Sequence, residues 1–170
     1  MNTIIIYATK HGTVHQCASQ LSKAISGKVD LYRINKDNFP DLSQYDAVII
    51  GGSIYAGRIQ KEIKEFCNEN ISELMRKKIG LFICCMLQEN AQTNLKQSFP
   101  EDLFNAAIAK DCFGGEMKFS DMNFLEKTIT KMVSKSNVKK DSQEVNMDMT
   151  KDISMISEEN IQRFANIFNG

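Results

Sequence analysis

The residues best suited to bind a ligand lie in a short polar segment, residues 9–14, which follows a run of apolar residues. The segment consists of Thr9, Lys10, His11, Gly12, Thr13 and Val14. Its threonine hydroxyls can donate hydrogen bonds, and its glycine lets the backbone approach a ligand closely. A strand that passes into a helix leaves unpaired N–H groups at the positive end of the helix dipole, which favours a bound anion. The segment therefore predicts a phosphate site, but a plain turn whose polar residues cap the helix explains it equally well.

Two further segments follow apolar runs. Residues 51–58 contain glycines at both ends and a tyrosine, Tyr55, between them. The glycines indicate unusual backbone angles or a close approach to a ligand, and the tyrosine ring can offer its face to a flat ligand. A flexible turn with a surface tyrosine is the alternative. The third segment, residues 86–90, carries polar side chains but no diagnostic residue.

Short runs of mostly apolar residues predict the strands that must position these segments. The predicted strands are residues 3–8, 29–34, 47–50, 79–86 and 109–113. The first, third and fourth are continuous apolar runs, typical of strands buried on both faces. The second alternates between polar and apolar residues, which indicates a strand at the edge of the sheet. We expect Gly51 and Gly52 to end the third strand.

Apolar residues at helical spacing lie between the strands. They predict helices over residues 14–25, 59–74, 92–97 and 122–133, another beginning near residue 98 and a last one beginning at Ser157. We expect Gly27 to end the first helix and Ile156 and Ile161 to form a hydrophobic staple around the last. Residues 134–150 are polar without periodicity and predict a long loop. Strands that alternate with helices predict an α/β fold with a parallel sheet, whose ligands bind at the carboxyl ends of the strands.

Composition narrows the possible functions. Lys and Arg total 21 and Asp and Glu total 21, so the formal net charge is zero. A nucleic-acid-binding protein needs a basic surplus, so we expect no such partner. The five cysteines form no CxxC motif, which favours unlinked thiols in a reducing cytoplasm. We see no targeting segment and no apolar run long enough to span a membrane, so we expect a cytoplasmic protein.

Cysteine and histidine positions do not predict a metal site or a nucleophile. Cys84 and Cys85 are adjacent on a predicted strand and must point to opposite faces, so they cannot hold one metal together. We interpret both as buried packing residues, and Cys17, Cys67 and Cys112 likewise. His11 and His15 are four residues apart, but we expect His15 at the surface. No catalytic residue is predicted.

Residues 5–13 and 45–57 carry a resemblance to a known family. They resemble the flavodoxin family, and most closely its subgroup of menaquinone-dependent protoporphyrinogen oxidases, which carries a helix and loop matching about residues 119–152. The resemblance covers nearly the whole chain. It implies one domain over residues 1–170, with a flavodoxin-like three-layer sandwich and a five-stranded parallel sheet in the order 2-1-3-4-5. It also implies an insertion at about residues 118–152, before the last helix.

The resemblance implies FMN as the cofactor. The first segment would hold the phosphate, and the second and third would flank the isoalloxazine ring. The implied FMN-binding residues are Thr9, Lys10, His11, Gly12, Thr13, Val14, Ser53, Ile54, Tyr55, Ala56, Gly57, Met86, Leu87 and Gln88. The family's phosphate loop has hydroxyl residues at its first, third and sixth positions. Here Thr9 keeps the first, whereas His11 and Val14 replace the other two.

The implied function is electron transfer through a bound flavin, with a redox partner protein or a quinone. A quinone-dependent protoporphyrinogen oxidase is the alternative, and a flavin-free partner-binding domain is a weaker one, so the choice between enzyme and carrier stays open. Residues 118–140 contain six lysines, two acidic residues and several large apolar residues. Such a segment can cover a hydrophobic or porphyrin substrate or lie on the inner face of a membrane. An ordinary amphipathic helix with its lysines in water is the alternative.

Overall fold

The computed structural model describes residues 1–35, 39–86, 88–117 and 153–170. The helix predicted at residues 122–133 and the loop predicted at residues 134–150 lie outside these residues. The chain divides into two compact units, one formed by Met1–Gly115 with Met155–Gly170 and the other by Glu116–Ser154. The first unit contains the three segments that follow the predicted strands.

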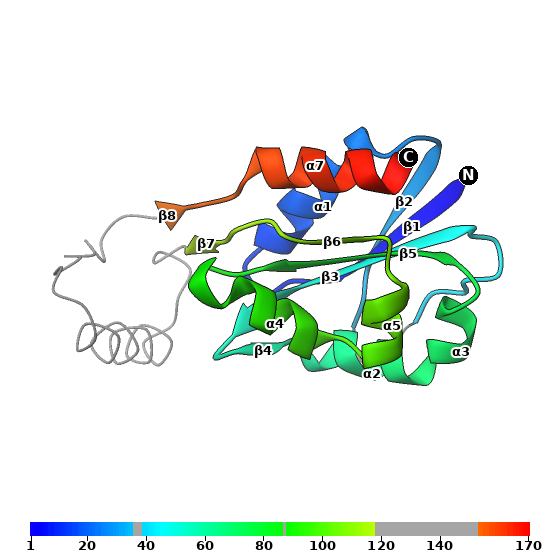
Figure 1. Ribbon diagram of the computed structural model, residues 1–170, viewed down its shortest axis with the longest axis horizontal. Coiled ribbons are helices and arrows are strands. Elements are labelled where there is room, and N and C mark those ends of the chain that lie inside the picture. Colours follow the sequence, from blue (N-terminus) through cyan, green and yellow to red (C-terminus); the bar gives the residue numbers. More distant parts are fainter. Residues whose placement is uncertain (36–38, 87, 118–152) are drawn as a thin grey trace, which may run out of the picture. The chain divides into compact units, whose positions relative to one another are not determined.

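The first unit is built on a parallel sheet (Figure 1). Its strands are β1 (Asn2–Ala8), β2 (Lys28–Arg33), β3 (Ala47–Tyr55), β5 (Lys78–Cys84) and β6 (Ala109–Cys112), with β4 (Arg58–Ile59) antiparallel to β3. The order of the parallel strands is β2-β1-β3-β5-β6. This confirms the predicted five-stranded parallel sheet, its order and the edge position of β2.

Helices cover both faces of the sheet (Figure 1). One face carries α1 (Thr13–Ala24) and α7 (Glu158–Asn169); the other carries α2 (Lys61–Glu69), α3 (Ile71–Leu74), α4 (Ala91–Ser98) and α5 (Glu101–Ala106), with the short helix η1 (Gln88–Asn90) before α4. In the second unit, β7 (Glu116–Met117) pairs antiparallel with β8 (Ile153–Ser154). No helix in the described part of the chain is long and apolar enough to span a membrane.

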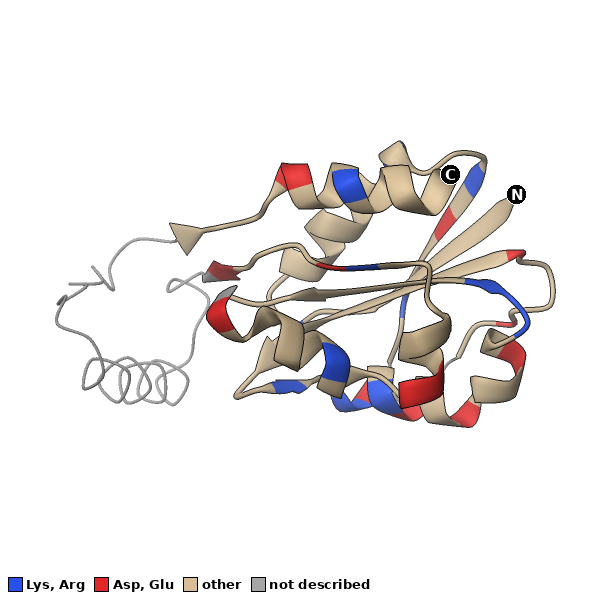
Figure 2. Cartoon of the chain, in the orientation of Figure 1, with Lys and Arg blue, Asp and Glu red and all other residues tan. Residues whose placement is uncertain are grey.

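The central strands separate two hydrophobic cores. Alternate residues of β1 point to opposite faces, so Ile4 and Ile6 pack with α2 and α4 while Ile5 packs with α1 and α7. Each such buried side chain contributes about 1.5–3 kcal/mol to folding. Figure 2 shows no charged residue on β1 or β3, in keeping with burial on both faces.

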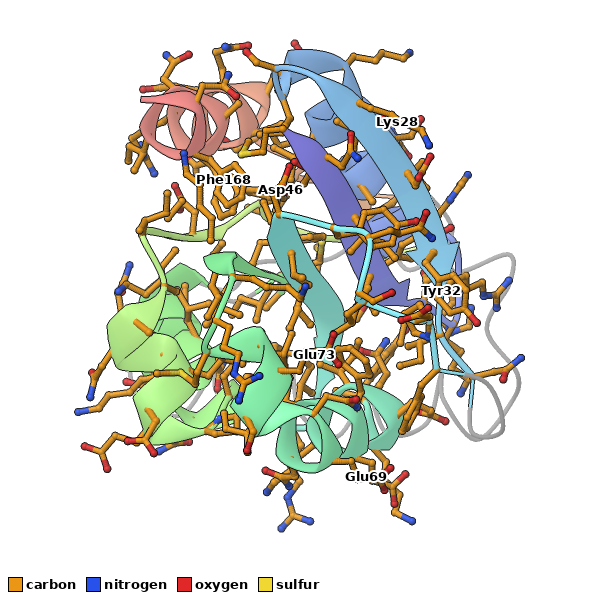
Figure 3. All side chains as sticks on the ribbon, turned by 90° about the vertical axis from the view of Figure 1, so that its right-hand side faces the viewer. Lys28, Tyr32, Asp46, Glu69, Glu73 and Phe168 are labelled. Carbon is orange, nitrogen blue, oxygen red and sulfur yellow. The ribbon has the colours of Figure 1, made fainter. Side chains whose placement is uncertain are left out.

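Phenylalanine rings complete the core beneath α7. The ring centroids of Phe82 and Phe113 lie 4.6 Å apart, and Phe164 meets Phe113 edge-on at 5.4 Å. Phe168 stacks on Phe164 at 6.0 Å and points from α7 toward the sheet (Figure 3). Gly80 of β5 faces these two rings, since a Cβ there would lie 2.7 Å from Phe164 and 3.0 Å from Phe168.

The prediction that Gly51 and Gly52 end the third strand is wrong. The strand runs through both glycines to Tyr55. Gly51 pairs with Phe82 of β5, and a side chain at Gly51 would collide with that ring. A side chain at Gly52 would meet Ile59 at 2.8 Å. These glycines therefore make room for neighbouring side chains within the sheet, and they do not break it.

Two helix limits also differ from the prediction. The first helix ends at Ala24, because Ile25 is already extended, and Gly27 lies beyond it in the turn before β2 with φ 94°. The predicted helix over residues 59–74 is interrupted at Asn70, whose side-chain amide donates to the Phe66 carbonyl oxygen at 3.0 Å. This hydrogen bond provides a donor for a carbonyl oxygen in the last turn of α2, and α3 begins at the residue after Asn70.

The predicted start of the last helix is confirmed. The Ser157 hydroxyl accepts a hydrogen bond from the Asn160 backbone N–H at 3.2 Å, as an N-cap does. Ile161 is buried, and Ile156 packs against the same core. The predicted helix at residues 92–97 and the predicted strand at residues 109–113 correspond to α4 and β6 to within one residue at each end. The helix predicted to begin near residue 98 is α5, which begins at Glu101.

We expect Gly80→Ala to destabilise the protein by about 1–3 kcal/mol, because the added methyl must displace the rings of Phe164 and Phe168. Urea denaturation measures the effect as a lower midpoint at an unchanged slope. A Gly80→Ala/Phe164→Leu double variant should recover part of the loss, with a coupling energy of about 0.5 kcal/mol or more. Additive losses would show that the glycine does not serve to accommodate the ring.

Candidate functional site

The segment after β1 forms a closed polar loop at the carboxyl edge of the sheet. The Thr9 hydroxyl accepts a hydrogen bond from the Gly12 backbone N–H at 3.0 Å. The Arg33 guanidinium donates to the Thr9 carbonyl oxygen at 3.1 Å, which ties the loop to the end of β2. Gly12 has φ 88°, a left-handed conformation that suits glycine, and nothing lies within 4 Å of where its Cβ would be. The loop therefore leaves open space beside a fixed backbone.

The N-terminus of α1 opens onto this loop without a side-chain cap. Gly12 occupies the N-cap position, and the first turn contains no acidic residue. The first N–H groups of the helix have no partner in its own hydrogen-bond ladder, and they stand at the positive end of its dipole. Thr13 and Val14 are buried, at 6% and 0% exposed, so neither presents its side chain at the surface. This donor set fits an anion such as phosphate.

The segment predicted as a loop over residues 51–58 is largely a β-hairpin. Ile54 pairs with Ile59 and Tyr55 pairs with Arg58, so the turn itself contains only Ala56 and Gly57. Both have positive φ, 47° and 76°, as a type I′ turn requires. The tight turn accounts for the positive φ of Ala56 and Gly57. The pairing of β3 with β4 explains why β3 continues beyond Gly51 and Gly52.

The hairpin brings Tyr55 against the first loop. Its ring lies edge-on to the His11 ring with the centroids 6.3 Å apart, and the Lys10 ammonium lies 6.0 Å from the Tyr55 centroid. Tyr55 is 41% exposed, which leaves ring surface available to a ligand. Ser53, also a predicted site residue, is buried near the end of β3. The structure thus places the first two predicted segments together.

Part of the third predicted segment lies outside the described residues. Met86 is half-buried just after β5, and a Cβ on Gly115 would lie 2.9 Å from its backbone nitrogen. Leu87 is not described. The backbone of Gln88 begins η1, and its side chain is not described.

Sequence reasoning missed a cavity beside the first loop. It has a volume of about 590 Å³ and lies where β1, β2 and α2 meet, and its lining residues are Ala8, Thr9, Lys10, Arg33, Ile34, Asn35, Gln60 and Glu62. The side-chain amide of Gln60 is buried, and neither its oxygen nor its nitrogen has a hydrogen-bond partner within the described residues. Ile34 and Asn35 directly follow β2, which is the signal that could have identified this part of the site.

Tyr7 and His15 form a hydrogen-bonded pair behind the loop. The distance between the Tyr7 hydroxyl oxygen and His15 Nδ1 is 2.6 Å. Burial raises the pKa of Tyr7, and the charge of Arg33 opposes this, so the phenol stays protonated. The tautomer of His15 sets which of the two groups donates. His15 is exposed, as predicted, but it also holds this buried hydroxyl.

Comparison with known proteins identifies the architecture. The flavodoxin domain family matches residues 4–145. The protoporphyrinogen IX dehydrogenase [quinone] of Escherichia coli strain K12 is 29% identical over 77 residues, which are 44% of this chain and 42% of that enzyme. The chain therefore matches less than half the length of this curated relative.

Two solved structures share the fold. A WrbA-like flavodoxin from Agrobacterium tumefaciens has a TM-score of 0.55 at 15% identity, covering 99% of this chain and 95% of that one. A flavodoxin from the domain Archaea has a TM-score of 0.54 at 14% identity, covering 82% of this chain and 99% of that one. At these identities the likeness concerns the fold alone.

We expect Ala56→Asn to stabilise the hairpin, because Asn tolerates the positive φ that Ala56 adopts and Asn-Gly is the favoured type I′ pair. The gain should be up to about 1 kcal/mol, measured by urea denaturation. Ala56→Val is the matched comparison and should destabilise, since a β-branched residue tolerates positive φ poorly. Equal effects of the two substitutions would contradict the observed turn.

Proposed function

The chain belongs to the flavodoxin domain family, and from this premise we propose that it is a redox protein that passes electrons through bound FMN to a partner. FMN is the cofactor that this family indicates. The observation that carries the proposal is the meeting of two features at one edge of the sheet. One is the uncapped N-terminus of α1 beside Gly12, and the other is the exposed ring of Tyr55.

The phosphate would be held mainly by backbone groups. The open N-terminus of α1 supplies N–H donors, and Lys10 supplies a positive charge close to the same loop. The Thr9 hydroxyl already accepts a bond from Gly12, and it keeps its own proton to donate. Because His11 and Val14 stand where the family has hydroxyl residues, fewer side chains donate here. We therefore propose that the affinity for the phosphate rests on the loop backbone.

The flavin ring would lie against Tyr55. This ring is exposed beside the two-residue turn of the hairpin, and it lies near His11 and Lys10. Met86, half-buried at the end of β5, can add an apolar contact. When bound, FMN supplies one- and two-electron transfer, while the chain fixes its position and controls its access to partners.

A second candidate function is quinone-dependent oxidation of protoporphyrinogen. It is favoured by the 29% identity over 77 residues to the E. coli enzyme of that name. On this alternative a quinone accepts the electrons, and the segment at residues 118–152 would form part of the substrate site. Contact of residues 118–140 with a membrane surface is likewise a prediction from the sequence, since the structure does not describe these residues.

We expect the purified protein to bind FMN and to perturb its visible absorption spectrum. Tyr55→Ala should weaken FMN binding by about 2- to 12-fold, the equivalent of one aromatic contact. Met75→Ala is the matched control. Met75 is 44% exposed, close to the 41% of Tyr55, but it lies after α3 at the opposite edge of the sheet. Spectrophotometric titration measures both.

Absence of FMN binding at high concentration would overturn the redox proposal. The flavin-free partner-binding domain would then be the better interpretation. If Tyr55→Ala and Met75→Ala weakened FMN binding equally, the proposal that the protein binds FMN would stand. The proposal that the hairpin forms part of the FMN site would be wrong.

Deletion of residues 118–152 separates the carrier from the enzyme. Met117 and Ile153 are paired across β7 and β8, so an Asn-Gly turn can join them directly. We expect the shortened carrier to keep FMN binding and most electron transfer to an artificial acceptor. The enzyme would be favoured instead if the full chain oxidised protoporphyrinogen and the shortened chain did not, while both bound FMN.

A further inference from the structure

A pair of thiols that the proposed function does not use lies under the carboxyl edge of the sheet. The Sγ atoms of Cys85 and Cys112 are 3.5 Å apart, and the two residues are only 5% and 3% exposed. Cys85 follows the last residue of β5, and Cys112 ends the neighbouring strand β6. Both side chains belong to the core beneath α2 and α4. The pair is thus formed by tertiary structure, because its members are separated by 27 positions in the chain.

Fixed hydrogen bonds hold Cys112 in place. Its backbone N–H donates to the Asp111 carboxylate at 2.8 Å, and its carbonyl oxygen accepts from the Asn160 amide at 2.8 Å. Arg163 of α7 binds the other carboxylate oxygen of Asp111 at 2.7 Å. These contacts anchor the backbone of Cys112 to α7 and leave its sulfur directed at Cys85.

The environment of Cys112 favours the thiolate. A hydrogen bond from the Cys85 thiol lowers the pKa of Cys112 to about 7; burial and the charge of Asp111 oppose this, and backbone N–H groups of Gly114 and Cys85 support it. By contrast, burial raises the pKa of Cys67 to about 12. The pKa of Cys84 is raised by a hydrogen bond with Cys17 and by burial. Since the thiolate is the reactive form, these cysteines should differ in their reactivity.

We infer that Cys85 and Cys112 form a redox-active dithiol that a small hydroperoxide converts into an intramolecular disulfide. The Cys112 thiolate attacks the peroxide, an S–O bond forms as the O–O bond breaks, and the peroxide leaves as water or an alcohol after taking a proton. The Cys85 sulfur then attacks this sulfenic acid, the S–S bond forms, and the hydroxyl leaves as water with the Cys85 proton. Two thiols are oxidised and one peroxide is reduced.

Closure of this bond needs movement of the chain after β5, because Cys112 pairs with Ile83 and Cys85 lies two residues further on. The sulfur atoms must approach from 3.5 Å to about 2 Å, the length of a disulfide bond. The peroxide must be small, because Cys85 and Cys112 are only 5% and 3% exposed. The disulfide would bond β5 to β6 one residue before Met86. It would therefore restrain the start of the third predicted segment.

Hydrogen peroxide on the intact, folded chain tests this inference. After one equivalent, we expect the thiol count, measured after denaturation, to fall from five to three. The mass should fall by two hydrogen atoms, and dithiothreitol should reverse both changes. Peptide mapping should find Cys85 joined to Cys112. This readout is a covalent bond within the chain, so it is independent of FMN binding and of the proposed function.

Neighbouring alanine substitutions provide the matched control. Cys84 and Cys85 are adjacent but belong to opposite cores, so Cys84→Ala should keep the loss of two thiols and Cys85→Ala should abolish it. In Cys85→Ser, whose hydroxyl can still donate to Cys112 but cannot form a disulfide, dimedone should trap Cys112 as a sulfenic acid. The inference is overturned by an unchanged thiol count in the wild-type chain, by a link between Cys17 and Cys84, or by irreversible oxidation of Cys112 alone.

Discussion

The parallel pairing of β1 with β3 is the interaction on which the rest of the structure depends. Ile5 pairs with Ile49 at the centre, and Ala8 pairs with Gly52 at the carboxyl end. Both strands are buried on both faces, so a slip of one residue would move every apolar side chain to the wrong core. This fixed register places the loop that follows β1 beside the end of β3, which is the first strand of the hairpin. The contact between His11 and Tyr55 follows from it, since both lie three residues beyond that last pair.

The fold was largely predictable because its signals are local. Continuous apolar runs predicted the buried strands, helical spacing predicted the helices, and Ser157 predicted the last N-cap. One error occurred where tertiary structure decides: Phe82 of the neighbouring strand occupies the space that a side chain at Gly51 would need, and nearby residues do not reveal this. The other is local, because the Asn70 amide bonds to the Phe66 carbonyl oxygen four residues earlier, where apolar spacing alone predicts an unbroken helix.

The candidate site was predictable in its parts but not in its assembly. The glycine and hydroxyls after β1 and the aromatic residue after β3 indicated a ligand. Their meeting depends on the two-residue turn at Ala56 and Gly57, for which the sequence offers alanine where Asn is usual. Arg33 and Gln60 line the cavity beside the first loop, and they come from β2 and the start of α2. No sequence motif marks either residue. The thiol pair is also invisible in sequence, since only the pairing of β5 with β6 brings Cys112 to Cys85.

The position of α7 has a consequence for how the chain is made. This helix, which follows every strand of the sheet in the sequence, supplies Phe164 and Phe168 to one core, and its Arg163 and Asn160 hold β6. During synthesis every strand of the sheet leaves the ribosome before these residues do. Until then α1 is the only described helix on that face, and the apolar surface around Gly80 and Phe82 is open to water. The nascent chain therefore carries an unfinished face until α7 emerges, and chaperones have that interval in which to bind it.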